Sequence, residues 1–336
     1  MIHTYSNPPQ IVANTTTSAV AFSILSPSNA LAYDRIKLRL EEYRILLASN
    51  SDTIELPTEN GTTVLCRRQA IRMETFLDQA ESLMQDIVQS RHTSMIIVLY
   101  RLRDLARVLD NLKLGNECRL AGDCALKLAV VLGKRSHELK RDLAGTMALI
   151  AGLSVYQPRA RDLFSKAVTI CEEVDAMEPS VASKMTLFTV LARAGCWSKD
   201  YPHRGAQWLE DASQLITTGL LSTTVPPLLC SVIFNTYANY LYALGRYAEA
   251  VVVCQNAFTI QYSLVIDSPA KHTSSLVRSL TIRGDSHCNL AEYHDAISAY
   301  EAAEEYCRGS SAHDPHHYSN LIEQLLHRIH NCTIRI

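Results

Sequence analysis

The sequence predicts an all-α fold, a solenoid built from antiparallel pairs of helices, and three observations lead to it. Hydrophobic residues make up 47% of the 336 positions and charged residues 20%, which is typical of a globular protein. The chain has only 12 glycines and 11 prolines, fewer turn residues than a β-sandwich or a doubly wound sheet normally needs. Apolar residues recur at intervals of three and four positions over most of the chain, the period of amphipathic helices.

The first 91 residues predict a disordered start followed by one pair of helices. Residues 1–28 are rich in Ser, Thr, Asn and Pro, a composition typical of disorder. Apolar residues at helical spacing then predict helices over 30–48 and 64–90, with a loop over 49–62 between them. We expect this pair, residues 29–91, to be either an N-terminal cap or a degenerate first repeat.

Two similar eight-residue segments occur further along the chain. Residues 243–250 read ALGRYAEA and residues 289–296 read NLAEYHDA, 46 positions apart. An apolar helical face precedes each octet and another follows it. Gly245 favours the left-handed conformation that ends a helix, and the alanines at 250 and 296 allow two backbones to approach closely. Each octet therefore predicts the corner of an antiparallel helix pair.

The same register recurs upstream, with a small residue near the start of each second helix. The small positions are Cys118, Ala160, Gly205 or Ala206, Ala250 and Ala296. They lie 42 to 46 residues apart and predict a repeat array over residues 92–308. Prolines that tolerate the first turn of a helix precede the first helices of the later copies, at Pro179, Pro226, Pro227 and Pro269. Residues 309–336 predict a loop and a helix over 318–330, either a cap or the first helix of another repeat.

This register of bulky and small residues resembles the tetratricopeptide repeat (TPR), a helix–turn–helix unit of 34 residues. The longer period resembles the extended TPR arrays of kinesin light chains and of fungal and bacterial signalling ATPases. The resemblance implies a right-handed superhelix whose concave groove is lined by the first helix of each unit.

Composition excludes several classes of partner. The formal net charge of −2 provides no basic excess for nucleic acid, and no cationic amphipathic face favours a membrane surface. No run of 18 apolar residues predicts a membrane span. The ten cysteines lack metal-binding spacing, so we expect a reduced, cytoplasmic protein.

Motifs of catalysis and cofactor binding are absent, so we expect no enzyme activity and no cofactor. Neither a phosphate-binding G-x-x-x-x-G-K-[ST] loop nor G-x-G-x-x-G, G-x-S-x-G or H-E-x-x-H occurs. A histidine cluster at His313, His316 and His317, followed by His327 and His330, has the donors for a metal site. No cysteine or carboxylate is placed with it, so we expect a polar loop and no metal, although the sequence leaves metal binding open.

The resemblance assigns candidate ligand contacts to the first helices. These positions are Arg103, Arg107 and Asn111, then Asn235, Asn239 and Tyr242, then Arg278, Asp285 and Asn289. An asparagine amide both donates and accepts, so the pair at 235 and 239 could hold an extended main chain, or could simply be tolerated surface residues. The arginines at 103 and 107 would suit an acidic or C-terminal carboxylate ligand. The unit between them offers only Gly145, Leu149, Gly152 and Leu153, which predicts an apolar patch.

These features favour a non-catalytic scaffold or adaptor that binds a peptide or a partner helix in the groove. The alternative is a TPR sensor or regulatory fragment of a larger NTPase-type signalling protein. The identity of the protein partner and any self-association stay open.

Overall fold

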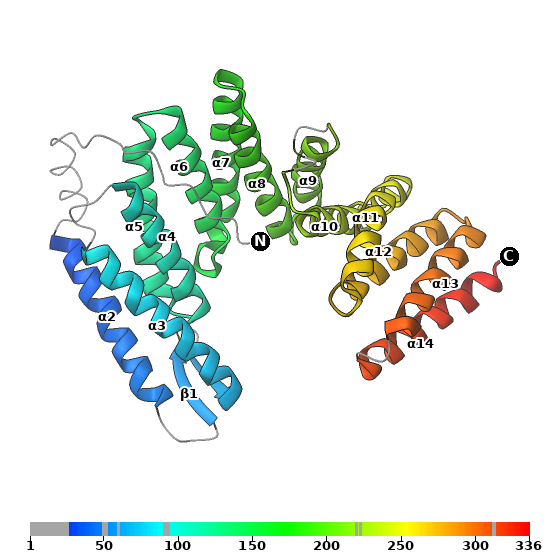
Figure 1. Cartoon of the computed structure of the whole chain (residues 1–336), viewed down its shortest axis with the longest axis horizontal. Helices are drawn as coiled ribbons and strands as arrows, with labels where there is room; N and C mark the ends of the chain where they lie inside the picture. Colours follow the sequence, from blue (N-terminus) through cyan, green and yellow to red (C-terminus); the bar gives the residue numbers. More distant parts are fainter. Residues whose placement is uncertain are drawn as a thin grey trace. The chain divides into compact units, whose positions relative to one another are not determined.

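The computed structural model describes the chain from residue 27 onward in several stretches (Figure 1). The described residues are 27–48, 53–58, 61–89, 95–218, 221, 224–310 and 314–336. They divide into two compact units, with the boundary after Ala167. The expected all-α fold of paired helices is confirmed, with one small β-hairpin added. The expectation of disorder falls on residues 1–26, outside the described part, and on the first two residues of a helix that begins at Pro27.

Unit 1 is a row of helices, and those between Pro27 and Ala151 each pack against the next in the sequence. Its elements are α2 (Pro27–Leu47), β1 (Thr53–Thr58), β2 (Gly61–Cys66), α3 (Arg67–Gln89), α4 (Met95–Asn111), α5 (Gly115–Gly133), α6 (His137–Ala151), the short 3-10 helix η2 (Ser154–Tyr156) and the first half of α7 (Gln157–Met177).

The loop expected over residues 49–62 is wrong where the structure describes it. Strands β1 and β2 pair antiparallel, with Thr53 opposite Cys66 and Thr58 opposite Gly61. The reason is local chemistry: both segments are rich in β-branched residues, which favour strands. The hairpin shortens the following helix, which begins at 67 rather than 64.

Unit 2 continues the pairing in the same manner. After the end of α7 it contains α8 (Val181–Trp197), α9 (Pro202–Thr217), α10 (Pro227–Ala243), α11 (Tyr247–Asp267), α12 (Pro269–Asn289), α13 (Tyr293–Ser310) and α14 (Pro315–Thr333). Each helix from α8 onward packs against its successor. The first helices of successive pairs also touch, α8 with α10 and α10 with α12. The predicted C-terminal helix is longer than expected, so His316 and His317 lie in its first turn.

The predicted register of small residues is confirmed. Cys118, Ala160, Ala250 and Ala296 are each fully buried near the start of a second helix. In the later pairs, larger residues on the first helix fill the space beside them, because a small residue at the crossing allows the two backbones to approach.

Three corners share one backbone conformation. Lys113, Gly245 and Ala291 have φ angles of 61°, 75° and 61°, in the left-handed region. In the Gly245 corner, Arg246 N donates to the Leu241 carbonyl at 2.9 Å, and the other two corners repeat this six-residue hydrogen bond. These bonds satisfy carbonyls that the helix end would leave free, so the corner ends the first helix and aims the second back along it.

Helix α11 is, within the described residues, the one helix long and apolar enough to cross a membrane by length and composition alone. It is the second helix of a pair, and Ala250, Cys254 and Ala257 on it are buried in unit 2. A core helix has the same composition.

Candidate functional site

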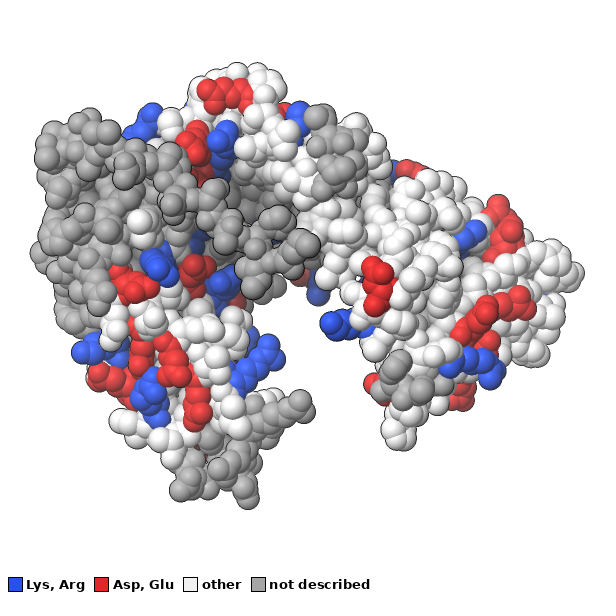
Figure 2. Space-filling view, in the orientation of Figure 1, with Lys and Arg blue, Asp and Glu red and all other residues white. Residues whose placement is uncertain are grey.

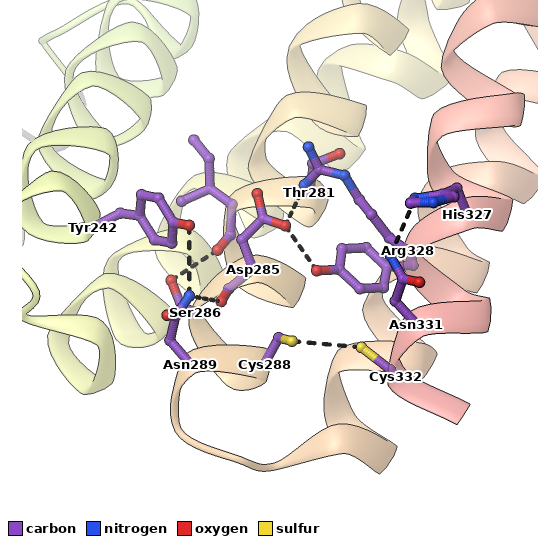
Figure 3. A network of polar contacts seen from close by, with 12 residues as sticks. Tyr242, Thr281, Asp285, Ser286, Cys288, Asn289, His327, Arg328, Asn331 and Cys332 are labelled. Atoms are coloured by element: carbon purple, nitrogen blue, oxygen red, sulfur yellow. Dashed lines mark hydrogen bonds and ion pairs between the residues drawn. The ribbon is translucent and has the colours of Figure 1, made fainter. Parts of the chain in front are cut away.

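A polar network joins the first helices α10, α12 and α14 of unit 2 (Figure 3). Tyr242 projects from α10, Asp285 and Asn289 from α12, and Arg328 from α14. The sequence predicted the first three as ligand contacts, and the structure brings them together. Arg328 is a further member that the sequence did not single out.

Asp285 is the centre of this network. It accepts a hydrogen bond from the Tyr300 hydroxyl at 2.7 Å and forms an ion pair with Arg328. Burial and the hydrogen bond to Asp285 raise the pKa of Tyr300 above its usual value, so the phenol stays a donor. Burial alone would lower the pKa of Arg328, but its contact with Asp285 raises it. The charges compensate one another and fix the aspartate between two helices.

Asn289 links this centre to α10. Its Nδ2 donates to the backbone oxygen of Asp285 at 2.8 Å and lies 3.5 Å from the Tyr242 hydroxyl. The Tyr242 ring packs against Tyr247 with a centroid separation of 5.5 Å, so the corner holds the tyrosine in place. Asn289 itself is exposed, which leaves this end of the network open to a ligand.

Asn235 does not serve the groove, and its prediction as a ligand contact is wrong. The side chain is only 7% exposed. Its Nδ2 donates to Ser275 Oγ at 3.0 Å, and its Oδ1 accepts from Ser279, which also donates to Gln261 at 2.7 Å. The position lies on the flank of α10 that α12 covers, so the amide is used inside the protein.

Asn239 and Arg278 remain accessible. Asn239 is half-buried and Arg278 is exposed, and neither has a recorded hydrogen bond or ion pair within the described part of the chain. Helix α10 carries no charged residue, and its exposed side chains include Leu228, Leu229 and Val232. Over the 46-residue interval, Val232 corresponds to Arg278. The first helices of unit 2 thus present apolar surface on α10 and a cation on α12.

In unit 1 the two predicted arginines are separated. Arg107 is exposed, pairs with Asp104 at 3.2 Å, and lines an open groove of about 560 Å³ between α3 and α4. Arg103 does not line it; its guanidinium lies 5.2 Å from the Tyr100 ring centroid, and burial lowers its pKa. The two arginines do not line this groove together, and a carboxylate ligand for the pair stays a prediction. Asn111 is exposed at the end of α4.

Acidic side chains compete with any anionic ligand in that groove. Asp78, Asp86 and Asp104 line it, and Asp86 pairs with Arg101 at 3.1 Å. Figure 2 shows basic and acidic side chains alternating over this part of unit 1. The groove is a surface ion-pair network rather than a site for a carboxylate.

The apolar patch expected on α6 is also wrong. Leu149 and Leu153 are 8% and 6% exposed, so they form part of the core. An apolar residue at an expected groove position was here a signal of burial.

The histidines of the cluster at 313–317 do not all lie in the described part of the chain. His313 lies outside the described residues, while His316 and His317 lie in α14, where His317 Nε2 is 3.5 Å from Ser274 Oγ. The donor atoms that do gather within 4.8 Å belong to His287, Glu292 and Asp295.

Two residues of this group, His287 and Glu292, stabilise the corner between α12 and α13. His287 Nδ1 and Glu292 Oε2 are 2.7 Å apart, and the Glu292 backbone nitrogen donates to the His287 carbonyl at 2.9 Å. The side-chain contact and the backbone bond join the same two residues, so they stabilise the turn between α12 and α13 together.

Sequence reasoning missed the contribution of α14, although a signal existed. Continuing the 46-residue interval from Asp285 reaches Asn331, which labels α14 as another first helix. Asn331 Nδ2 lies 3.1 Å from His327 Nδ1, on the same helix as Arg328. The Arg328 contact itself needed the tertiary structure.

Known proteins resemble this chain in their fold and not in their sequence. No family model matches the chain, and no curated protein sequence matches it. The crystal structure of BtubC (BKLC) from P. vanneervenii superposes with a TM-score of 0.55 at 16% identity, covering 70% of this chain and 91% of that one. A putative kinesin light chain with nearly identical TPR-like repeats from Podosopora anserina gives 0.43 at 15% identity, covering 64% and 96%.

The protein therefore shares its fold of stacked helix pairs with BtubC, and its own register of small and bulky residues is the one that resembles the TPR. At these identities the likeness shows the fold alone, and the ligand has to be argued from this chain's own surface.

Proposed function

We propose that this protein is a non-catalytic interaction module that binds an extended peptide segment of a partner protein. The binding surface is the face formed by α10, α12 and α14. The observation that carries the proposal is the contrast within this face: buried positions repeat every 46 residues, whereas the exposed Val232 changes to the exposed Arg278 and the half-buried Asn239 changes to the half-buried Asp285. Stacked repeats present such faces to ligands.

The chemistry of the face favours a peptide with apolar residues next to an acidic one. Leu228, Leu229 and Val232 provide apolar contact on α10, while Arg278 is an exposed cation on α12. Asn239 and Asn289 can pair with peptide N–H and C=O groups whatever the peptide's side chains. Because Arg328 is paired with Asp285, we assign a ligand carboxylate to Arg278 rather than to Arg328.

Nine of the ten cysteines, those whose side chains the structure describes, are free thiols, which supports a reducing compartment such as the cytoplasm as part of the same proposal.

A displayed library of random peptides tests the proposal. Peptides selected on the full chain should carry apolar residues beside Asp or Glu. For a synthetic winner, Arg278→Glu should weaken binding by about tenfold or more, because it replaces attraction with repulsion. Fluorescence anisotropy measures the dissociation constants.

The matched control is Asn256→Asp, which adds a negative charge on an exposed position of α11 outside the first-helix face. It should leave binding unchanged. Equal losses in the two variants, or selected peptides that bind Arg278→Glu as tightly as the natural chain, would refute the proposed face.

A further inference from the structure

Two cysteines meet between α12 and α14. The Cys332 thiol donates a hydrogen bond to the Cys288 sulfur, and the two sulfurs are 3.6 Å apart. Cys332 is 1% exposed, while Cys288 is half-buried and so lies nearer to solvent. The two positions are 44 residues apart in the sequence, so the contact belongs to the tertiary fold.

The contact lies beside the polar network (Figure 3). Cys288 follows Asp285 by three residues on α12, and Cys332 follows Arg328 by four on α14, so each cysteine lies one helical turn from a member of the ion pair. The sulfur pair and the ion pair therefore join the same two helices at neighbouring levels.

We propose that Cys288 and Cys332 are a redox pair whose disulfide locks α14 onto α12. The inference does not depend on the proposed peptide binding. A disulfide requires the sulfurs to close to about 2.05 Å, a small approach from the observed contact. The lock would hold in place the helix that carries Arg328.

A hydroperoxide is the oxidant for this step. The Cys288 sulfur attacks a peroxide oxygen, the O–O bond breaks, and Cys288 becomes a sulfenic acid as water or an alcohol leaves. The Cys332 sulfur then attacks the Cys288 sulfur, the S–O bond breaks, and the hydroxyl departs as water with the Cys332 proton. The two thiols lose two electrons and two protons, and the peroxide is reduced.

The surroundings of the two thiols support this order of events. Burial, and then the hydrogen bond to Cys288, raise the pKa of Cys332 to about 11, so Cys332 is a thiol at neutral pH. It therefore does not react first with peroxide. The more accessible Cys288 meets the oxidant, and Cys332 is already in contact to resolve the sulfenic acid.

Peptide mapping of the full chain without reduction tests the proposal. After hydrogen peroxide treatment, trypsin should release residues 284–308 joined to residues 329–335, with a mass two hydrogens below the sum of the two peptides. Residues 284–308 also contain Cys307. A second cleavage before Asp295 separates Cys288 from Cys307 in the natural chain, so no variant is needed to locate the bond.

Variants and melting provide the matched comparison. Cys288→Ser should abolish the linked peptide, whereas Cys307→Ser, at a buried cysteine of α13, should keep it. The oxidised chain should melt about 5 °C or more above the reduced chain, since the bond closes a long loop. Peroxide treatment that leaves the two peptides unlinked, or a link that survives Cys288→Ser, would overturn the proposal.

Discussion

The helix pairs α10/α11 and α12/α13 have the same architecture but differ in the residues that pack where their two helices cross. Both contain a buried alanine near the start of the second helix, Ala250 or Ala296. At the next crossing, the first pair places Ala238 with Cys254, whereas the second places Gly284 with Tyr300 at the corresponding positions. A smaller residue on one helix accompanies a larger one on the other. Packing therefore couples the two residues at a crossing, because the Tyr300 ring leaves no room for a Cβ at position 284.

The outward positions of the two pairs follow no such rule. At the exposed position, Val232 on α10 becomes Arg278 on α12, and a charge appears where there was none. A change on the solvent side leaves the crossing volume unaffected, so repeats can diverge there without loss of the fold. Four predictions test this difference between the buried and the solvent-exposed positions.

The largest effect is expected at the tighter crossing. A Cβ on Gly284 would overlap the buried Tyr300 ring, at 2.7 Å from Cδ1. Gly284→Ala should therefore lower the free energy of unfolding by about 3 kcal/mol through overpacking. Urea denaturation measures it. Gly145→Ala on α6 is the control, because a Cβ there meets no atom within 4 Å, and it should be neutral or slightly stabilising. Equal stability of the two variants would contradict the coupling between the residue at position 284 and the Tyr300 ring.

The two asparagines of α10 should behave differently. Asn235→Ala removes the buried amide that bonds Ser275 and Ser279, leaves Gln261 as their remaining side-chain partner, and should cost about 2 kcal/mol. Asn239→Ala should change stability by less than about 0.5 kcal/mol, because Asn239 has no recorded partner within the described residues. Thermal melting compares them directly. If Asn239→Ala were the more damaging, the assignment of inner and outer faces on α10 would be reversed.

Reverse exchanges at two corners should change the stability of the protein in opposite directions. Gly245→Ala should cost about 1 kcal/mol, because φ of 75° disfavours a side chain even though a Cβ there meets no atom within 4 Å. Ala291→Gly should stabilise by about 0.5 kcal/mol, since it removes the same penalty at φ of 61° while making the unfolded chain more flexible. Chemical denaturation should give opposite signs; a shared sign would show that corner conformation does not govern these sites.

The smallest effect is expected in alkaline solution. The pKa of Tyr300 is raised in the folded protein, so the phenol stays protonated there while it ionises near pH 10 in the unfolded chain. Above pH 10 the unfolded state binds fewer protons, and stability falls as pH rises. Tyr300→Phe should make that fall shallower between pH 9 and 11 in urea titrations. An unchanged slope in Tyr300→Phe would mean that Tyr300 ionises alike in both states.

The sequence by itself determined the paired helices, their corners and the small residues at their crossings. Those features rest on local rules: helical period, a left-handed turn and the size of a buried side chain, each visible within one repeat. This is why Ala250, Ala296 and the corner at Gly245 could be assigned in advance.

Only the tertiary structure decided which polar residues face a ligand. A helical period identifies a face, but the neighbouring helix determines how much of that face it covers, which is why Asn235 is internal and Asn239 is not. Likewise, Asp285 meets Arg328 across 43 residues of sequence, and Cys288 meets Cys332 across 44. Such contacts depend on how successive first helices pack side by side, which no single repeat encodes.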